Sequence, residues 1–338
     1  MKKQPNKICI VRLDRIGDVV LTLPLAAILK SYYPQSKITF LTKHYTKEIA
    51  ENCKYVDRVI SLNGTEASKE ILSEIKKEFF DIIFIVSPNF PIAYTAFKAR
   101  IPMRIGTSRR WYSFLFNSKV DDSRKEVSFH ETEYNVRMLK PLGLDNAITK
   151  ETVDYGIELS NGTKNIASKI LAENGITADD RICIIHPGSG GSSVELPIEK
   201  YCALAKQISE KTHLKIVSTG SADEYDICQE VAQAGNGINL SGKLSLLNLM
   251  GVTEKSHIFI SNSTGPLHVA SALGKICIGF YPKVLVCSEK RWGPFSKNSF
   301  VFTPEQPCEN CTLEECHKNN CMDTIEIDQV IKKIIELN

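Results

Sequence analysis

The sequence predicts an α/β protein of two doubly wound, Rossmann-like domains that face each other across a central cleft. The chain has 338 residues, which is more than one hydrophobic core usually organises. Short runs rich in Ile, Val and Phe alternate with longer segments of helical periodicity, as in a parallel sheet covered by helices. A turn-rich stretch at residues 159–163 favours a linker. We therefore expect domains over residues 1–160 and 161–338.

Each half has its own series of elements. In the first half, strands are expected at residues 8–13, 37–41, 58–62, 82–86 and 103–106. Helices are expected at residues 17–32, 45–53 and 66–79. Pro24 either kinks the first helix or marks a start near Thr22.

The second half repeats the alternation. Strands are expected at residues 182–186, 215–219, 238–240, 257–261 and 275–279. Helices should begin near Pro197, Ser221, Ser245 and Gly265. Ser221 and Glu224 have the spacing of a capping box, and residues 327–337 form a closing amphipathic helix.

Charge and targeting signals narrow the class of protein. Residues 1–160 hold 25 Lys and Arg against 19 Asp and Glu, and the remainder holds 17 against 20. The basic half either meets an anionic partner or has a solvated basic surface, and no run of like charge favours nucleic acid. The N-terminus lacks the apolar region of a signal peptide, and no apolar run approaches the roughly 18 residues of a membrane span. A cytoplasmic protein with reduced thiols is expected.

The eleven cysteines fall into two groups. Seven lie singly in apolar or helical stretches and are expected to be small buried hydrophobes: Cys9, Cys53, Cys183, Cys202, Cys228, Cys277 and Cys287. The other four gather near the C-terminus, at Cys308, Cys311, Cys316 and Cys321, with His317 beside them. These four either bind a structural zinc ion or are reduced or locally disulfide-linked thiols.

Ligands of open parallel sheets bind beyond the carboxyl ends of the strands. The loop after the first strand contains Gly17 and Asp18, and Asp18 is expected at the start of the next helix. Its carboxylate could serve as a general base on a substrate hydroxyl, or it could only cap the helix.

The loop after strand 182–186 is rich in glycine and serine. It contains His186, Gly188, Ser189 and Gly190, and it lacks both the P-loop and the dinucleotide-binding patterns. Its many backbone amides suit phosphate oxygens, although a flexible connector has the same composition.

The loop after strand 257–261 leads into a helix. Pro266 suits the first helical position, with Thr264 or Gly265 as the cap. The free amides of this helix would bind a diphosphate. His268, in the first turn, either faces a ligand or is structural. A nucleotide diphosphate on the second domain and a base on the first would together suit glycosyl transfer.

Several motifs along nearly the whole chain resemble glycosyltransferase family 9, the heptosyltransferase-like enzymes of lipopolysaccharide core assembly, which have the GT-B fold. The resemblance lies in residues 10–12 and 17–24, His130, Glu133-Tyr134, Leu142-Gly143, His186-Pro187-Gly188, residues 220–224 and residues 263–270.

The resemblance implies an inverting, metal-independent transfer that requires no cofactor. The donor would be a nucleotide diphosphate sugar, ADP-heptose by family default, and the acceptor a lipid-linked core glycan. The enzyme would then act at the inner face of the cytoplasmic membrane, as a transient peripheral protein. Asp18 would be the general base.

The resemblance also assigns binding residues. Amides around Thr264, Gly265 and Pro266, with Ser189 and its glycine neighbours, would bind the diphosphate. Glu224 or Asp223 would accept hydrogen bonds from the ribose, unless Glu224 only completes its capping box. Arg12 would reach the acceptor or a phosphate, unless it is paired with Asp14 or Asp18.

Two departures from the family pattern leave the donor open. The family commonly has a Lys-x-Trp-Pro run where this chain has residues 194–197, without a cation, and an aspartate where it has Ser263. Substitutes for the missing cation could come from Lys200, Lys243, Lys290 or Arg291. An inactive or altered paralogue is the alternative.

Acceptor recognition is expected in the first domain. Here a basic and aromatic patch comprises Arg100, Arg104, Arg109, Arg110, Trp111 and Tyr112, unless these residues form only a solvated loop. Two other functions remain open from the residues: a nonhydrolysing nucleotide-sugar epimerase, and a nonenzymatic two-lobed sugar-binding protein.

Overall fold

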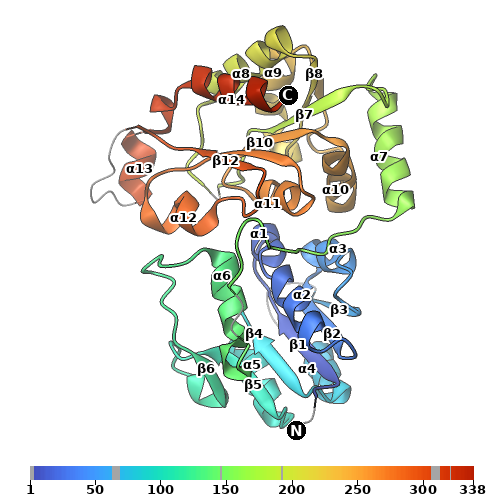
Figure 1. Ribbon diagram of the computed structural model, residues 1–338, viewed down its shortest axis with the longest axis vertical. Coiled ribbons are helices and arrows are strands. Elements are labelled where there is room, and N and C mark those ends of the chain that lie inside the picture. The colour runs from blue at the N-terminus through green and yellow to red at the C-terminus, as the bar shows by residue number, and fades with distance from the viewer. Residues whose placement is uncertain (1–3, 63–68, 145–146, 192, 306–312, 320) are drawn as a thin grey trace. The chain divides into compact units, whose positions relative to one another are not determined.

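The computed structural model divides the chain into two compact units, residues 1–158 and 159–338. The structure describes the chain except residues 1–3, 63–68, 145–146, 192, 306–312 and 320. Figure 1 shows the two units, with the first in blue to green and the second in yellow-green to red. The sequence predicts the boundary between residues 160 and 161.

The first unit contains a six-stranded parallel sheet in the order β3-β2-β1-β4-β5-β6. The strands are β1 (Lys7–Val11), β2 (Lys37–Lys43), β3 (Arg58–Leu62), β4 (Ile82–Ile85), β5 (Met103–Thr107) and β6 (Ser118–Val120). In the register, Ile8 of β1 lies opposite Ile38 of β2 and Ile82 of β4. The chain reverses its direction of winding beside β1, so the carboxyl end of β1 is the topological switch point of this sheet.

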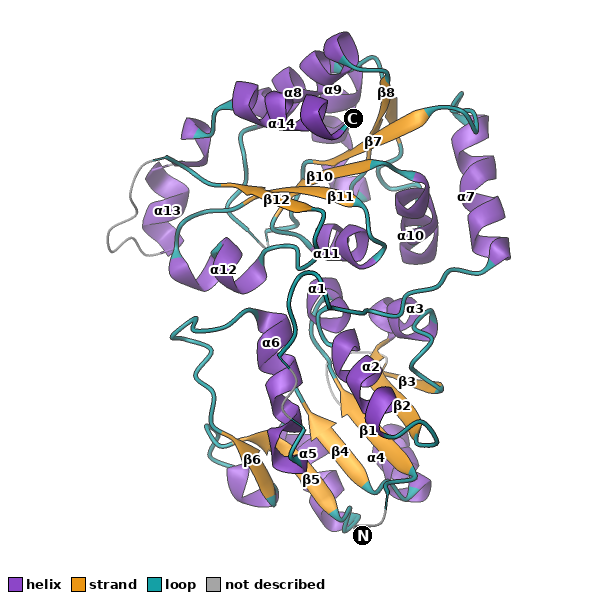
Figure 2. Cartoon of the chain, viewed as in Figure 1, coloured by secondary structure: helices purple, strands orange, loops and turns teal. Residues whose placement is uncertain are grey.

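Helices cover both faces of this sheet (Figure 2). They are α1 (Ile16–Val20), α2 (Leu23–Tyr32), α3 (Lys47–Glu51), α4 (Lys69–Glu78), α5 (Phe90–Lys98) and α6 (Glu131–Val136). Helices α4 and α5 contact each other on one face, and α2 contacts α6 on the other. Burial on both faces explains why the strand residues form nearly continuous apolar runs.

All five strands predicted in this unit are present, and three features differ from the prediction. The helix expected over residues 17–32 is two helices, because the chain turns at Leu21 and Thr22 and Pro24 stands in the first turn of α2. Strand β6 has only three residues, too few for a clear alternation pattern. Helices α5 and α6 are also absent from the prediction.

The second unit repeats the same topology, in the order β12-β11-β10-β7-β8-β9. Its strands are β7 (Arg181–His186), β8 (Leu214–Ser218), β9 (Ile238–Asn239), β10 (Ile258–Asn262), β11 (Ile276–Phe280) and β12 (Ser299–Phe302). The five predicted strands are present, and β12 is an addition to them. Here β7 lies beside β10, so the carboxyl ends of these two strands bring their following loops together.

The helices of this unit are α7 (Asn161–Glu173), α8 (Ile198–Lys211), α9 (Tyr225–Ala234), α10 (Leu246–Lys255), α11 (Gly265–Ala272), α12 (Glu289–Trp292), α13 (Leu313–Asn319) and α14 (Ile327–Leu337). Helices α8, α10, α11 and α14 begin where the sequence predicts. The predicted linker at residues 159–163 is wrong in part. The Ser160 side chain accepts a hydrogen bond from the Thr163 N–H, so these turn-forming residues start helix α7.

The single cysteines mostly fill the core. Five of the seven are buried, whereas Cys202 and Cys287 are half-buried. In the C-terminal quartet, Cys308 and Cys311 lie outside the described residues, Cys316 is buried and Cys321 is half-buried. Among the residues that the structure describes, no three His, Cys, Asp or Glu side chains are placed to share a metal ion. The same part of the chain contains no helix that is both long and apolar enough to cross a bilayer.

Candidate active site

Asp18 lies in the first turn of α1, just beyond the carboxyl end of β1. Its Oδ2 accepts a hydrogen bond from the backbone N–H of Arg15 at 3.1 Å, which fixes the start of the helix. Its Oδ1 is paired with Arg12. The side chain is 16% exposed, so the carboxylate is held on two sides and still reaches solvent. Asp18 therefore caps helix α1, and this contact is compatible with a role of its carboxylate as general base.

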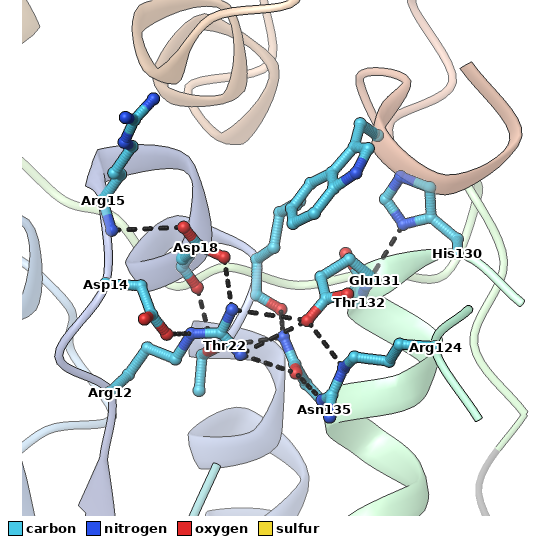
Figure 3. Close-up of polar contacts among 12 residues, drawn as sticks. Arg12, Asp14, Arg15, Asp18, Thr22, Arg124, His130, Glu131, Thr132 and Asn135 are labelled. Carbon is cyan, nitrogen blue, oxygen red and sulfur yellow. Dashed lines mark hydrogen bonds and ion pairs between the residues drawn. The ribbon is translucent and has the colours of Figure 1, made fainter. Parts of the chain in front are cut away.

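Arg12, the first residue after β1, is the centre of a buried charge cluster (Figure 3). Its Nε lies 2.9 Å from Asp14 Oδ2, and its Nη2 is paired with Asp18. Its Nη1 donates to Glu131 Oε1 at 3.3 Å. Burial acts to lower the pKa of the guanidinium, but the charges of Asp18, Glu131 and Asp14 outweigh it and raise that pKa. Of the two expectations for Arg12, pairing with Asp14 and Asp18 is the one that the structure shows.

Helix α6 supplies the other half of this cluster. Glu131 Oε1 also accepts a hydrogen bond from Arg124 Nε at 3.1 Å. Asn135 Oδ1 accepts from Arg12 Nη1 and from Arg124 Nη2, both at 3.2 Å. Its Nδ2 donates to the Leu21 carbonyl at 3.0 Å. The break between α1 and α2 therefore exposes a carbonyl that ties this segment to α6.

Sequence reasoning missed Glu131, Asn135 and Arg124. Glu131 and Asn135 are four residues apart, so they lie on one face of α6, and both are buried. The sequence pattern that could have indicated them is the pair of polar residues four positions apart within one short helix. His130 and Glu133, which carry part of the family resemblance, begin this helix: the His130 N–H donates to Glu133 Oε2 at 2.7 Å.

The predicted basic patch of the first unit divides in two. Arg104 donates from Nε to the Leu115 carbonyl at 2.8 Å and from Nη1 to the Ile101 carbonyl at 2.6 Å, so its guanidinium is used to hold neighbouring backbone. Arg109 and Arg110 are exposed beyond the carboxyl end of β5. Arg104 therefore has fewer donors left for an acceptor than Arg109 and Arg110 have, and its contact with an acceptor stays a prediction.

In the second unit, His186 ends β7 and is buried. Its Nδ1 lies 3.0 Å from Thr219 Oγ1. Burial lowers the pKa of the His186 ring to about 4, although the charge of Glu224 acts in the opposite direction. The ring is therefore neutral near pH 7. It supports the loop rather than supplying a positive charge to it.

Glu224 joins the glycine-rich loop to the turn that follows β8. Its Oε1 accepts a hydrogen bond from the Gly190 N–H at 3.1 Å, and its Oε2 accepts from the Ser221 N–H at 2.7 Å. A Cβ on Gly188 would come within 2.0 Å of Glu224 Oε1, so a larger residue fits there only if this carboxylate moves. Gly190 has a φ of 54°, which also favours glycine. The capping box is present, and the same carboxylate shapes the loop. Asp223 beside it is exposed.

Asn262, at the end of β10, joins the loops that follow β7 and β10. Its Nδ2 donates to the Pro187 carbonyl at 2.7 Å, and its Oδ1 accepts from the Leu196 N–H at 2.9 Å. Neighbouring Ser261 donates to the His186 carbonyl at 2.9 Å. Both side chains are completely buried. Sequence reasoning did not single out either residue, although two polar residues ending an apolar strand were visible.

Helix α11 begins at Gly265 directly after these residues, with Pro266 in its first turn. The Thr264 hydroxyl lies 2.9 Å from Ser261 Oγ, and its side chain does not cap the helix. The amides at this helix start are therefore not satisfied by the capping side chain, as an anion site requires. His268 is buried within the unit. Ser263 is half-buried in the loop between β10 and α11.

The model of glycosyltransferase family 9 (heptosyltransferase) matches residues 69–322, which is most of the chain. The chain belongs to glycosyltransferase family 9. A Haemophilus influenzae protein named as a glycosyltransferase is 28% identical over 299 residues, 86% of each chain. Lipopolysaccharide heptosyltransferase 1 of Campylobacter coli is 21% identical over 348 residues, 98% of each chain. This family 9 member is therefore a glycosyltransferase.

Solved structures have the same GT-B fold. The family 9 glycosyl transferase of Veillonella parvula superposes with a TM-score of 0.83 at 22% identity, over 100% of this chain and 98% of that one. The Escherichia coli ADP-heptose lipopolysaccharide heptosyltransferase II superposes with a TM-score of 0.78 at 19% identity, over 98% of both chains.

In this family 9 glycosyltransferase, a buried valine stands where the Lys-x-Trp-Pro run would begin. Val194 and Leu196 are buried in the hydrophobic core of the second unit, and only Glu195 between them is exposed. The Glu195 carboxylate accepts a hydrogen bond from the Ser189 hydroxyl. The loop therefore presents a carboxylate rather than a cation.

The four candidate replacement cations differ in placement. Lys200 Nζ donates to the Ile325 carbonyl at 2.9 Å, and Lys243 Nζ donates to the Asn239 carbonyl at 2.8 Å. Lys290 is exposed on α12, and Arg291 stacks 4.7 Å from the centroid of the Trp292 ring. Since α12 follows the carboxyl end of β11, Lys290 and Arg291 are the better placed of the four.

Proposed function

We propose that this family 9 glycosyltransferase moves a sugar from a nucleotide diphosphate donor to a hydroxyl of a lipid-linked lipopolysaccharide or lipooligosaccharide core glycan. The step would be a single inverting displacement with Asp18 as general base, and it would require no metal or other cofactor, as the family resemblance implies. The observation that carries this proposal is the placement of Asp18. Its carboxylate is fixed by Arg12 and by the Arg15 N–H at the switch point of the first sheet, and it still reaches solvent.

The hydrogen bonds of Asp18 leave it able to accept a proton. An ionised carboxylate has about four lone-pair positions, and the two contacts named above use one on each oxygen. A remaining position would take the proton of the acceptor hydroxyl as its oxygen attacks the anomeric carbon. The bond from that carbon to the diphosphate oxygen breaks in the same step. Attack from the opposite side inverts the configuration.

We assign Arg12 as a positioning residue rather than an acceptor ligand. Its buried guanidinium contacts Asp18 on one side and Glu131 on the other. Such fork geometry sets the direction of a carboxylate as well as its charge. Arg109 and Arg110, exposed beyond β5, keep the proposed role of contacting anionic groups of the acceptor.

The second unit would bind the donor diphosphate. Amides at the start of α11 and at residues 188–189 would stabilise the negative charge of a leaving diphosphate at the carboxyl edge of the sheet, with the Gly190 amide held by Glu224. Ser189 and Ser263 lie in the two loops, His268 lies in the first turn of α11, and Asp223 is the exposed carboxylate for the ribose. ADP-heptose is one candidate donor among nucleotide sugars, because the missing cation alters the diphosphate site.

The test compares Asp18→Asn with Asp14→Asn, since both carboxylates pair with Arg12. Transfer is followed by release of nucleoside diphosphate with a core glycan acceptor, and donor affinity by titration calorimetry. We expect kcat to fall about 10²- to 10⁴-fold in Asp18→Asn, with donor Kd unchanged. Asp14→Asn should stay within tenfold of the wild type. Full transfer by Asp18→Asn would remove Asp18 as the base.

A donor panel completes the test. Titrations with ADP, UDP, GDP and CMP sugars should show one preferred nucleotide. Heptose and hexose forms of that nucleotide then identify the sugar. Turnover that needs no acceptor would instead indicate an epimerase, and tight binding without turnover would indicate a sugar-binding protein.

A further inference from the structure

One surface of the first unit carries large aromatic side chains that no part of the described chain covers. It comprises the outer face of α5 and the turn after β5, and we call it the aromatic face. Its exposed members are Phe90, Tyr94, Phe97, Trp111 and Phe114. Trp111 and Phe114 are 73% and 67% exposed, whereas aromatic side chains of this size are mostly buried in folded proteins.

Helix α5 is apolar on both sides. Phe90, Tyr94 and Phe97 are spaced by four and three residues, so they form one stripe along the outer surface of the helix. The inner side, which includes Ile92 and Ala96, packs into the core. A surface helix normally presents polar side chains to water, so an aromatic outer stripe indicates a binding surface.

Ring contacts join the helix and the turn into one rigid patch. The centroids of Phe90 and Trp111 are 4.9 Å apart, and those of Phe90 and Tyr94 are 5.9 Å apart. Trp111 also packs edge-on against Tyr112, at 5.4 Å, and Tyr112 is part of the buried core. Phe90, Tyr94 and Trp111 are therefore linked to one another and to the buried Tyr112 beneath them.

The segment that carries this patch is predominantly basic. Residues 82–120 contain six Lys and Arg and no Asp or Glu, although Asp121, just after the segment, pairs with Arg109 at 2.9 Å. Arg110 adjoins Trp111 in sequence, and Lys98 Nζ lies 5.5 Å from the centroid of the Tyr94 ring. A predominantly positive surface repels a second copy of itself, so the charge argues against a symmetric dimer through this face.

We propose that the aromatic face docks this glycosyltransferase onto an anionic lipid bilayer. Tryptophan and tyrosine favour the boundary between headgroups and acyl chains, and basic side chains are attracted to anionic headgroups. Amphipathic binding of this kind needs no membrane-spanning helix. The inference goes beyond the peripheral location that the family resemblance implies, because it assigns the surface that contacts the bilayer, and it holds for any donor sugar.

The decisive measurement uses the two tryptophans of the chain, Trp111 and Trp292. Trp292→Phe leaves only Trp111, and Trp111→Phe leaves only Trp292, whose Nε1 donates to the Val286 carbonyl at 3.0 Å. Each variant is mixed with vesicles of phosphatidylglycerol and phosphatidylethanolamine that contain brominated acyl chains. We expect Trp111 emission to shift to the blue and to be quenched at least twofold, with Trp292 emission unchanged. Absence of quenching at Trp111 would overturn the proposal.

A binding series separates docking from folding and from catalysis. The triple variant Tyr94→Ser, Phe97→Ser, Phe114→Ser should lose at least tenfold in its vesicle partition coefficient. The matched control changes Tyr225 and Ile335 to serine, which are 47% and 49% exposed in the second unit, close to the 45% and 44% of Tyr94 and Phe97. This control should bind vesicles like the wild type. Thermal unfolding of each variant checks that it folds.

Other outcomes would identify a different occupant. Turnover on an acceptor dispersed in detergent should be unchanged in the triple variant, and its loss there would make the face a glycan platform instead. Self-association of the wild type that the triple variant abolishes would make it a protein interface. Equal binding to uncharged phosphatidylcholine vesicles would contradict the proposed attraction between the basic side chains and anionic headgroups. None of these results depends on Asp18, so failure here is distinct from failure of the proposed function.

Discussion

Arg12→Lys offers the sharpest test of the buried cluster in the first unit, because it keeps the positive charge and removes only the fork. The guanidinium uses three nitrogen positions: Nε toward Asp14, Nη2 toward Asp18, and Nη1 toward Glu131 and Asn135. A lysine ammonium has its three donors on one atom and cannot occupy these positions together.

The expected cost follows from the contacts that a lysine cannot make. If the ammonium still pairs with Asp18 and Glu131, the hydrogen bond to Asn135 is lost, at about 1–1.5 kcal/mol. The ion pair with Asp14, whose side chain is 42% exposed, is also lost, at up to about 1 kcal/mol. We therefore expect the free energy of unfolding of the first unit to fall by about 2 kcal/mol. Displacement of Asp18 by about 1 Å should lower kcat on the order of 10²-fold. Donor affinity should not change, because the proposed donor site lies on the second unit.

The assay follows hydrogen exchange in peptides from α1 and α6 as urea is raised, because a chain of two units need not unfold in one step. Arg58→Lys is the matched control. Arg58 also pairs with two carboxylates, Glu74 and Glu78, but its side chain is 45% exposed, so the cost should stay below about 1 kcal/mol. Equal destabilisation by both substitutions, or a full kcat in Arg12→Lys, would refute the positioning role.

Three further predictions concern the second unit. Gly188→Ala should weaken nucleotide binding about tenfold in calorimetry and cost about 1–3 kcal/mol of stability, because its methyl group would displace the Glu224 carboxylate. An unchanged Kd would contradict the proposed role of this loop in donor binding. The lowered pKa of His186 means that the unfolded chain takes up a proton below about pH 6.5 and the folded chain only near pH 4. Unfolding free energy should therefore decline by up to about 3 kcal/mol as pH falls through this window, and His186→Gln should remove that decline while exposed His213→Gln should not. Asn262→Ala should cost about 2–4 kcal/mol in urea unfolding, since it leaves a buried N–H and a buried carbonyl without their side-chain partner; a loss below about 1 kcal/mol would mean that the two loops do not depend on it.

The repeated strand pattern made the fold predictable, because buried parallel strands are visible as apolar runs. What the sequence could not supply were elements whose hydrophobic signal is weak or ambiguous. Strand β6 is three residues long, and α5 is apolar on both sides and so lacks helical amphipathicity. The turn-forming residues at 159–163 predict a linker and a helix start equally well, because serine and asparagine favour both.

The site was predictable where it follows a strand and unpredictable where it depends on distant residues. Asp18 and the loops at His186 and Thr264 all stand at carboxyl ends of strands. Glu131 lies 119 residues from Arg12, and no local pattern connects the two. Arg104 shows a related limit of sequence patterns, because they do not reveal that two nitrogens of this guanidinium bond neighbouring carbonyls.

The burial of Val194 limits how this loop could carry a cation. Replacing it with lysine would restore the family residue and would also place an ammonium group in a hydrophobic core, with Leu196 anchored beside it. A single substitution would therefore destabilise the second unit before it could contribute at the diphosphate. A cation on this loop would require several coordinated changes, or would have to come from another element.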